Sequence, residues 1–226
     1  MKTIVIALGG SLLDIRGETI DRFIELIREV GKDYKVFVVV GGGKIAKEYI
    51  GFGRKHGIDE EKLDEIGIAA TRLNAKLIST LLGIEGEIPH SVEEAVSKEG
   101  SVVIMGGTEP GHSTDAVAAE LAVKSDAEKL IIATDVRGVY DKDPKKFKDA
   151  CFLKEISVNR LIELYGTKWK KAGDSAVIDG PALRIIRDFR IRTVVVNGKD
   201  VENLKKAIYD EDFDGTRIKL TNEIDV

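Results

Sequence analysis

KVFVVVGGGK, residues 35–44, joins an unbroken apolar run to a glycine turn, and a helix-period pattern follows at once. A β-branched run of this length that ends at glycine is typical of a strand buried on both faces. Glycines lack a Cβ, so their backbone N–H groups can approach an anion, and the N-terminus of the following helix adds a favourable partial charge. The stretch therefore predicts a buried strand, a phosphate-binding turn and a helix, in that order.

The same alternation of strand and helix patterns extends along the chain in both directions. Further strand patterns lie at residues 3–8, 101–105, 129–134 and 192–196, and helix patterns at 19–30, 45–55, 60–82, 91–98, 114–124, 158–165, 181–188 and 201–209. Strands that alternate with helices form parallel sheets covered on both faces, so we expect an α/β fold. No linker-like segment interrupts the pattern. We expect one domain over residues 1–226, with approximate lobes at 1–120 and 121–226.

Composition excludes several classes of function. The chain has 226 residues, with 35 Lys and Arg against 39 Asp and Glu, and a net charge of −4. No apolar run approaches the roughly 20 residues of a membrane span, and the negative balance disfavours nucleic acid as a partner. We therefore expect a cytoplasmic protein that binds neither membrane nor nucleic acid. His56, His90 and His112 are too far apart for a structural zinc site, and the single Cys151 is expected to be buried and inert.

Two more glycine-rich turns follow strand patterns. Gly9-Gly10-Ser11 comes after residues 3–8, and residues 106–115, GGTEPGHSTD, come after residues 101–105. Each turn alone could be no more than a tight turn, but ligands of open α/β sheets bind at the carboxyl ends of the strands, where all three turns fall. The spacings of a P-loop and of a dinucleotide-binding fingerprint are both missing. We expect a phosphate ligand held in a different way.

A fourth polar segment follows residues 129–134. Tyr140 could form the wall of a base or ribose pocket, and Asp143-Pro144 could fix the turn. The structural alternative is that Tyr140 is a core residue and that Asp143-Pro144 is only a turn.

The ordered set of these segments resembles the amino acid kinase superfamily, and within it the archaeal type of uridylate (UMP) kinase. The resemblance covers almost the whole chain and is most specific at residues 40–44, 66–68 with 71–75, 106–119 and 134–144. It implies a three-layer α/β/α sandwich around a central, mainly parallel sheet of eight strands. It also implies transfer of the γ-phosphoryl group of ATP to UMP, which makes UDP in pyrimidine nucleotide biosynthesis.

Matching the family's motifs position by position implies two sets of binding residues. The ATP set is Gly9, Gly10, Ser11, Gly43, Lys47, Thr134, Tyr140 and Asp143. The UMP set is Gly42, Asp64, Thr108, Glu109, Pro110, Gly111, His112, Ser113 and Thr114. Asp64 matches an acid that holds the UMP ribose, and its structural alternative is a carboxylate on a helix surface. Arg72 is either a contact of the UMP phosphate or an exposed helical arginine.

Phosphoryl transfer needs alignment and positive charge more than covalent chemistry. Backbone N–H groups, Mg²⁺ delivered with ATP and one or two cationic side chains would suffice, without a metal site made by the protein alone. Many relatives carry a lysine where this chain has Ala7, so we expect Lys44 or Arg137 to supply the missing charge. Asp135 and Asp179 would orient such cations; alternatively, they are a turn residue and a helix N-cap.

Other functions within and outside this superfamily stay open from the sequence. A related kinase would act on isopentenyl phosphate or an acylated amino acid, and a nucleotide-binding regulator would have no turnover. The resemblance also implies a homohexamer built as a trimer of dimers. The apolar face of the helix pattern at residues 60–82 would serve either such a subunit contact or the core.

Overall fold

The computed structural model of the chain describes residues 1–142, 144, 147–168 and 177–220. Its main sheet has seven strands, β1 (Lys2–Leu8), β2 (Tyr34–Val40), β3 (Val102–Met105), β4 (Lys129–Thr134), β7 (Glu155–Ser157), β8 (Thr193–Asn197) and β9 (Gly215–Lys219). The strand order is β3-β2-β1-β4-β8-β9-β7, and every neighbouring pair is parallel except β8 and β9. Two short strands, β5 (Val139–Tyr140) and β6 (Phe152–Leu153), form a separate antiparallel pair.

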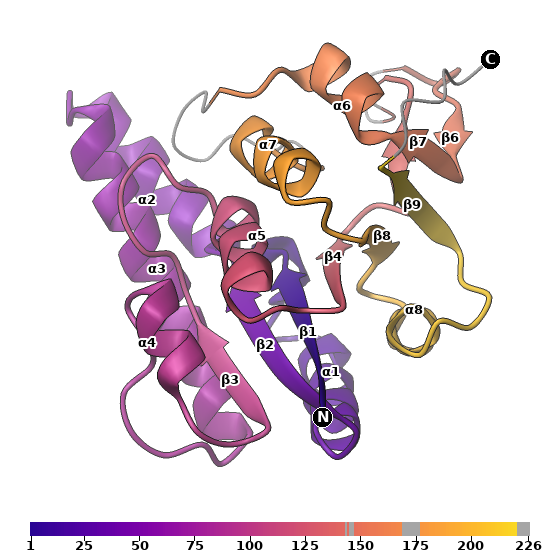
Figure 1. Ribbon diagram of the computed structural model, residues 1–226. Coiled ribbons are helices and arrows are strands. Elements are labelled where there is room, and N and C mark those ends of the chain that lie inside the picture. Colours follow the sequence, from indigo (N-terminus) through magenta and orange to yellow (C-terminus); the bar gives the residue numbers. More distant parts are fainter. Residues whose placement is uncertain (143, 145–146, 169–176, 221–226) are drawn as a thin grey trace.

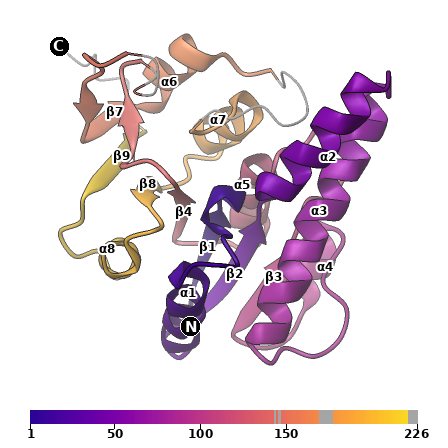
Figure 2. The same cartoon turned by 180° about the vertical axis from the view of Figure 1, so that it is seen from behind.

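Helices cover both faces of the sheet (Figure 1). They are α1 (Thr19–Val30), α2 (Gly43–Lys55), α3 (Glu60–Leu81), α4 (Val92–Ser97), α5 (Thr114–Lys124), α6 (Val158–Tyr165), α7 (Gly180–Asp188) and α8 (Val201–Ile208), with a short 3-10 helix at Gly10–Leu12. The two opposite views show α5 and α7 on one face and α1 and α8 on the other (Figures 1 and 2). Helices α2 and α3 lie side by side, and α3 packs on β2 and β3 in the core on the α1 side. The fold is the expected α/β/α sandwich.

The central strands are apolar throughout because both of their faces are buried. In β1, Val5 and Ala7 belong to the core on the α5 side, whereas Ile4, Ile6 and Leu8 belong to the core on the α1 side. Successive side chains of a strand point to opposite faces, so a strand between two helix layers needs an apolar residue at every position. The structure thus confirms what the unbroken apolar runs predict, namely that both faces of the central strands are buried.

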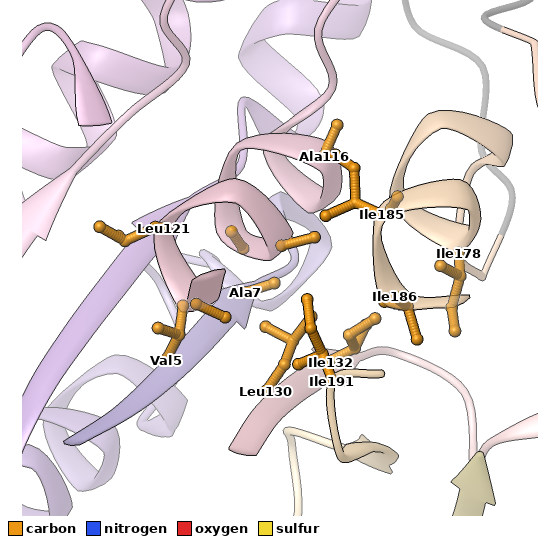
Figure 3. Packing of buried hydrophobic residues seen from close by; sticks show 14 of the residues in the cluster. Val5, Ala7, Ala116, Leu121, Leu130, Ile132, Ile178, Ile185, Ile186 and Ile191 are labelled. Atoms are coloured by element: carbon orange, nitrogen blue, oxygen red, sulfur yellow. The ribbon is translucent and has the colours of Figure 1, made fainter. Parts of the chain in front are cut away.

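Helix α5 is buried on nearly every side, which fixes its position against the sheet. Ala116, Ala118, Ala119 and Ala122 are all buried, and Figure 3 shows Ala116 and Leu121 of α5 in the same cluster as Val5 and Ala7 of β1. Small side chains let a helix approach a sheet closely. The N-terminus of α5 is therefore held at the carboxyl edge of the strands, where the glycine turns lie.

Two sequence expectations differ from the structure. The central sheet has seven strands among the described residues, where eight were expected. Strands β5, β6, β7 and β9 have no clear strand signal in the sequence, because three of them have two or three residues and β9 (GTRIK) contains a single large apolar residue. Among the described residues, none of the helices combines the length and apolar composition that a bilayer crossing needs.

Candidate active site

A cavity of about 690 Å³ lies where the carboxyl ends of the central strands meet the glycine turns. Parallel pairing in register brings Leu8, the last residue of β1, level with Val40 of β2 and Ala133 of β4. The turns that follow these strands therefore start at the same height and line one cavity. The expected site residues that line it are Gly9, Gly10, Ser11, Gly42, Gly43, Lys47, Asp64, Glu109, His112, Ser113, Thr114, Thr134, Asp135 and Tyr140.

The turns after β1 and β2 pack so closely that only glycine fits. A Cβ on Gly10 would collide with the backbone of Gly43, and Gly43 has a φ of +63°, in the left-handed region that favours glycine. Gly43 is also the first residue of α2, and Gly42 before it gives α2 no side-chain cap. The first N–H groups of α2 thus lie at the cavity with the positive end of the helix dipole, an arrangement suited to a phosphate.

Helix α3 holds two of these glycine turns in place. The side-chain amide of Asn74 donates to the carbonyl oxygens of Gly41 and Gly42, at 2.9 and 3.1 Å. The hydroxyl oxygen of Thr71 accepts a 2.7 Å hydrogen bond from the N–H of Gly107. Both side chains are buried. Helix α3 therefore fixes the spacing between the turn after β2 and the turn after β3.

The loop between β3 and α5 closes one side of the cavity. Asp64 of α3 accepts a hydrogen bond from the N–H of Gly111 at 2.9 Å through Oδ2. His112 lies between two carboxylates, with Nδ1 at 3.3 Å from Glu109 and Nε2 at 3.7 Å from Glu120. Ser113 caps α5 by accepting from the N–H of Ala116. Asp64 is thus a carboxylate that faces this loop, not an isolated surface residue.

Burial raises the pKa of two carboxyl groups next to this loop. Burial first, and then the charge of Asp179, raise the pKa of the Asp115 carboxyl to about 8. Burial also raises the pKa of Asp179, although hydrogen bonds from Ser113 and the N–H of Ala182 oppose the shift. Asp115 lines the cavity and Asp179 does not. As expected for the structural alternative, Asp179 is the N-cap of α7.

The opposite side of the cavity is formed by β4 and β5. Tyr140 lies in β5 and meets the Phe152 ring of β6 edge-on, with the ring centroids 5.6 Å apart. Thr134, the last residue of β4, and Asp135 after it line the same wall. Lys142 also lines the cavity, and its Nζ atom lies 2.6 Å from Asp149. Tyr140 is thus a wall residue with a half-buried ring, and Asp143 lies outside the described residues.

The two cations chosen from the sequence are not among the residues that line the cavity. Lys44 is exposed and lies 3.6 Å from Glu48 on the same helix. Arg137 binds both carboxylate oxygens of Asp214, at 2.9 and 2.8 Å. Lys47, one turn after Lys44, does line the cavity. The structure therefore does not place Lys44 or Arg137 at the site, because each side chain is directed to a carboxylate elsewhere.

Other expected residues surround the cavity without lining it. They are Thr108, Pro110 and Gly111. Asp115, Thr71 and Lys142 line the cavity and were not chosen from the sequence. Asp115 had an available signal, because it follows the GGTEPGHST loop directly and opens a helix. Thr71 had none, because its role depends on contact with a loop 36 residues away.

Cys151 corrects another expectation. It is exposed, and its N–H donates to Asp141 at 2.8 Å. The residue follows the described turn at 147–150 and precedes the short strand β6, so no core covers it.

Comparison with known proteins identifies the family. The model of the amino acid kinase family matches residues 2–197. A uridylate kinase of Methanobrevibacter smithii is 44% identical over 221 residues, which are 95% of this chain and 98% of that protein. The crystal structure of uridylate kinase from Archaeoglobus fulgidus superposes with a TM-score of 0.84 at 43% identity and covers 97% of this chain and 100% of that one. UMP kinase from Bacillus anthracis, 20% identical, shares the fold with a TM-score of 0.75 over 97% of this chain and 96% of that one. The chain therefore belongs to the amino acid kinase family.

Proposed function

We propose that the protein is a UMP kinase that transfers the γ-phosphoryl group of ATP to UMP and forms UDP for pyrimidine nucleotide biosynthesis. The observation that carries this proposal is the convergence of three glycine-rich turns on one cavity at the carboxyl edge of the sheet. The similarity to archaeal proteins named uridylate kinase, over nearly the full length of both chains, supports the choice of acceptor. Both nucleotides are cytoplasmic metabolites, so we propose that the enzyme acts in the cytoplasm.

The two substrates would occupy opposite sides of the cavity. UMP would lie against Asp64 and the loop at residues 108–114, largely in the lobe of residues 1–120. The adenosine part of ATP would lie against Thr134 and Tyr140, in the lobe of residues 121–226. The ATP phosphates would meet the turns at Gly9 to Ser11 and at Gly43, which line the cavity between these two sides.

Transfer in this arrangement would be a direct, in-line displacement. The N–H groups at the start of α2 and the ammonium group of Lys47 would stabilise charge on the transferring phosphoryl group. Mg²⁺ would enter the site with ATP, because phosphate oxygens are ligands that this ion prefers. That ion would neutralise phosphate charge. Asp135 lines the cavity and would hold its water ligands.

A panel of phosphoryl acceptors tests the proposal. Purified protein with MgATP would be assayed for ADP release with UMP, CMP, AMP, isopentenyl phosphate and an N-acyl amino acid. We expect UMP to give the highest kcat/KM, because the polar groups of the loop can hydrogen-bond a base, whereas an isoprenoid tail would gain no hydrogen bond from them. An equal kcat/KM for another acceptor would contradict the assignment. ATP binding without ADP release for any acceptor would indicate a regulator.

We also propose that the protein assembles as a homo-oligomer, with a hexamer built from dimers as the expected state. Leu73, Leu77 and Leu81 form one exposed stripe along α3, and Tyr49 and Phe52 are exposed on the adjacent α2. Large exposed apolar areas mark contact surfaces. Sedimentation analysis of Leu73→Glu should show a smaller particle than the wild type. Phe189→Glu, which changes an equally exposed residue after α7, should not. A monomeric wild type would contradict assembly.

A further inference from the structure

Arg72 of α3 is not among the residues that line the cavity. Its side chain lies against the backbone of the loop between β3 and α5, at residues 107 and 108. Its Nε atom donates to the carbonyl oxygen of Gly107 at 3.1 Å, and Nη2 donates to that of Thr108 at 2.9 Å. The neighbouring Thr71 accepts from the N–H of Gly107 on the same side. Adjacent residues of α3 thus fix successive peptide groups of the loop.

These contacts determine where the N–H groups of the loop point. The described residues contain no cis peptide bond, and in a trans peptide the C=O and N–H groups point in opposite directions. Since the carbonyls of Gly107 and Thr108 face Arg72, the N–H groups of Thr108 and Glu109 face away from α3. Neither N–H donates a hydrogen bond to another of the described residues. Gly107 and Glu109, the two neighbours of Thr108, line the cavity.

We propose that Arg72 is a positioning residue for the phosphoryl acceptor. By holding two carbonyl oxygens, it presents the N–H groups of Thr108 and Glu109 as a pair of donors to acceptor oxygens of the bound nucleotide. This inference rests on the proposed UMP kinase activity. The oxygens belong either to the base or to the phosphate, and uracil has a carbonyl oxygen at the one position where cytosine carries an amino group. Donors aimed at the base would favour UMP over CMP, because an amino group would leave a donor unpaired.

An arginine suits this position for a geometric reason. Its planar guanidinium carries several N–H donors at fixed angles, so it can hold two carbonyls at once. A lysine at position 72 has a single mobile ammonium group and would not fix both peptide planes. The buried hydrogen bonds of Thr71 and Asn74 keep this part of α3 aligned with both glycine turns. The loop is therefore positioned by a rigid support.

Two variants and a matched control test the role. Arg72→Met removes the charge and keeps the length, and Arg72→Lys keeps the charge without the planar fork. Lys76→Met is the control, because Lys76 lies one turn later on α3 and donates to the carbonyl of Gly86 at 2.8 Å, outside the cavity. We expect Arg72→Met to raise the KM for UMP about 10-fold or more while the KM for ATP stays within about 2-fold. Arg72→Lys should fall between, and Lys76→Met should match the wild type.

Acceptor selectivity separates the two sources of the oxygen atoms. If the N–H pair contacts the base, Arg72→Met should lower the ratio of kcat/KM for UMP to that for CMP. If it contacts the phosphate, both values should fall together, and the KM for ATP should still be unchanged. Thermal unfolding of each variant would establish that it is folded, and Arg72→Lys decides the matter if Arg72→Met does not fold.

Three results would overturn the inference. An unchanged KM for UMP in a folded Arg72→Met variant would show that the loop needs no support, while UMP phosphorylation by the wild type would leave the proposed function intact. Equal increases in the KM for ATP and for UMP would indicate a general structural role. A wild type that does not phosphorylate UMP would overturn the proposed function first, and this inference with it.

Discussion

The guanidinium carbon of Arg137 lies 4.1 Å from the centre of the Phe152 ring. Phe152 in turn meets Tyr140, a wall residue of the cavity, edge-on. The carboxylate of Asp214 holds the guanidinium in this position through both of its oxygens. Arg137 does not line the cavity and contacts its wall through the rings of Phe152 and Tyr140. Its effect on ATP binding should therefore be indirect.

Replacing Arg137 by Ala should weaken ATP binding without removing catalytic charge. Loss of the cation–π contact would free the Phe152 ring and, through it, Tyr140. We expect the KM for ATP to rise about 3- to 10-fold, with kcat at saturating ATP and the KM for UMP near wild-type values. Steady-state kinetics with each substrate varied in turn would measure this. A 10-fold fall in kcat at saturating ATP would instead favour the cation role that the sequence predicts.

Lys47 is the better candidate for the catalytic cation. It lines the cavity from the first turns of α2, whereas Lys44 on the same helix pairs with Glu48. We expect Lys47→Ala to lower kcat about 10-fold or more, equivalent to about 1.4 kcal/mol of transition-state stabilisation. Lys44→Ala should change kcat by less than about 2-fold. The reverse order of effects would place the phosphates at the outer face of α2.

Asp64 and Tyr140 should act on different substrates. Asp64→Ala removes the acceptor of the Gly111 N–H and, in the proposed complex, a hydrogen bond to the ribose. We expect UMP binding to weaken by about 1 to 3 kcal/mol, the cost of leaving a buried donor unpaired. Tyr140→Ala should weaken ATP more than UMP. Calorimetric titration of each variant with UMP and with ATP would measure the two effects separately. Glu65→Ala is the control, because Glu65 is the exposed neighbour of Asp64. If both variants weaken the same nucleotide, the proposed division of the cavity is wrong.

The sequence predicted the parts of the fold that depend on neighbouring residues. The runs in β1, β2, β4 and β8 are buried on both faces, so their composition alone marks them as strands. The glycine turns were predictable for the same reason, since the left-handed Gly43 needs glycine whatever surrounds it.

Contacts between distant segments were not predictable in this way. Arg137 is directed away from the cavity by Asp214, which lies 77 residues later in the chain. Arg72 is held by loop carbonyls 35 and 36 residues away. The residues next to a cation in the sequence do not show which distant group it will bind. Its position can therefore indicate a candidate site residue but not where its side chain points. Strand β9 is similar, because its pairing with β8 and β7 depends on the whole sheet.

The last prediction concerns the pH dependence of stability. The carboxyl of Asp115 has an ordinary pKa of 3.8, and burial with the nearby Asp179 raises its pKa to about 8 in the folded protein. Between these two pH values the folded protein keeps a proton that the unfolded chain has lost. The stabilisation from this protonated form is complete at low pH and is lost as the pH rises through about 8.

Asp115→Asn should remove this dependence, because an amide resembles the protonated carboxyl and does not titrate. Relative to the wild type, its free energy of unfolding should be higher at alkaline pH and should fall less as the pH rises from acidic to alkaline values. Asp21→Asn is the control, since Asp21 lies in the first turn of α1 but is exposed, so this variant should keep the wild-type slope. Urea denaturation at three pH values across this range would measure the slopes. Parallel curves for the wild type and Asp115→Asn would show that Asp115 is ionised in the folded protein, and the cavity wall would then carry a charge that phosphates must overcome.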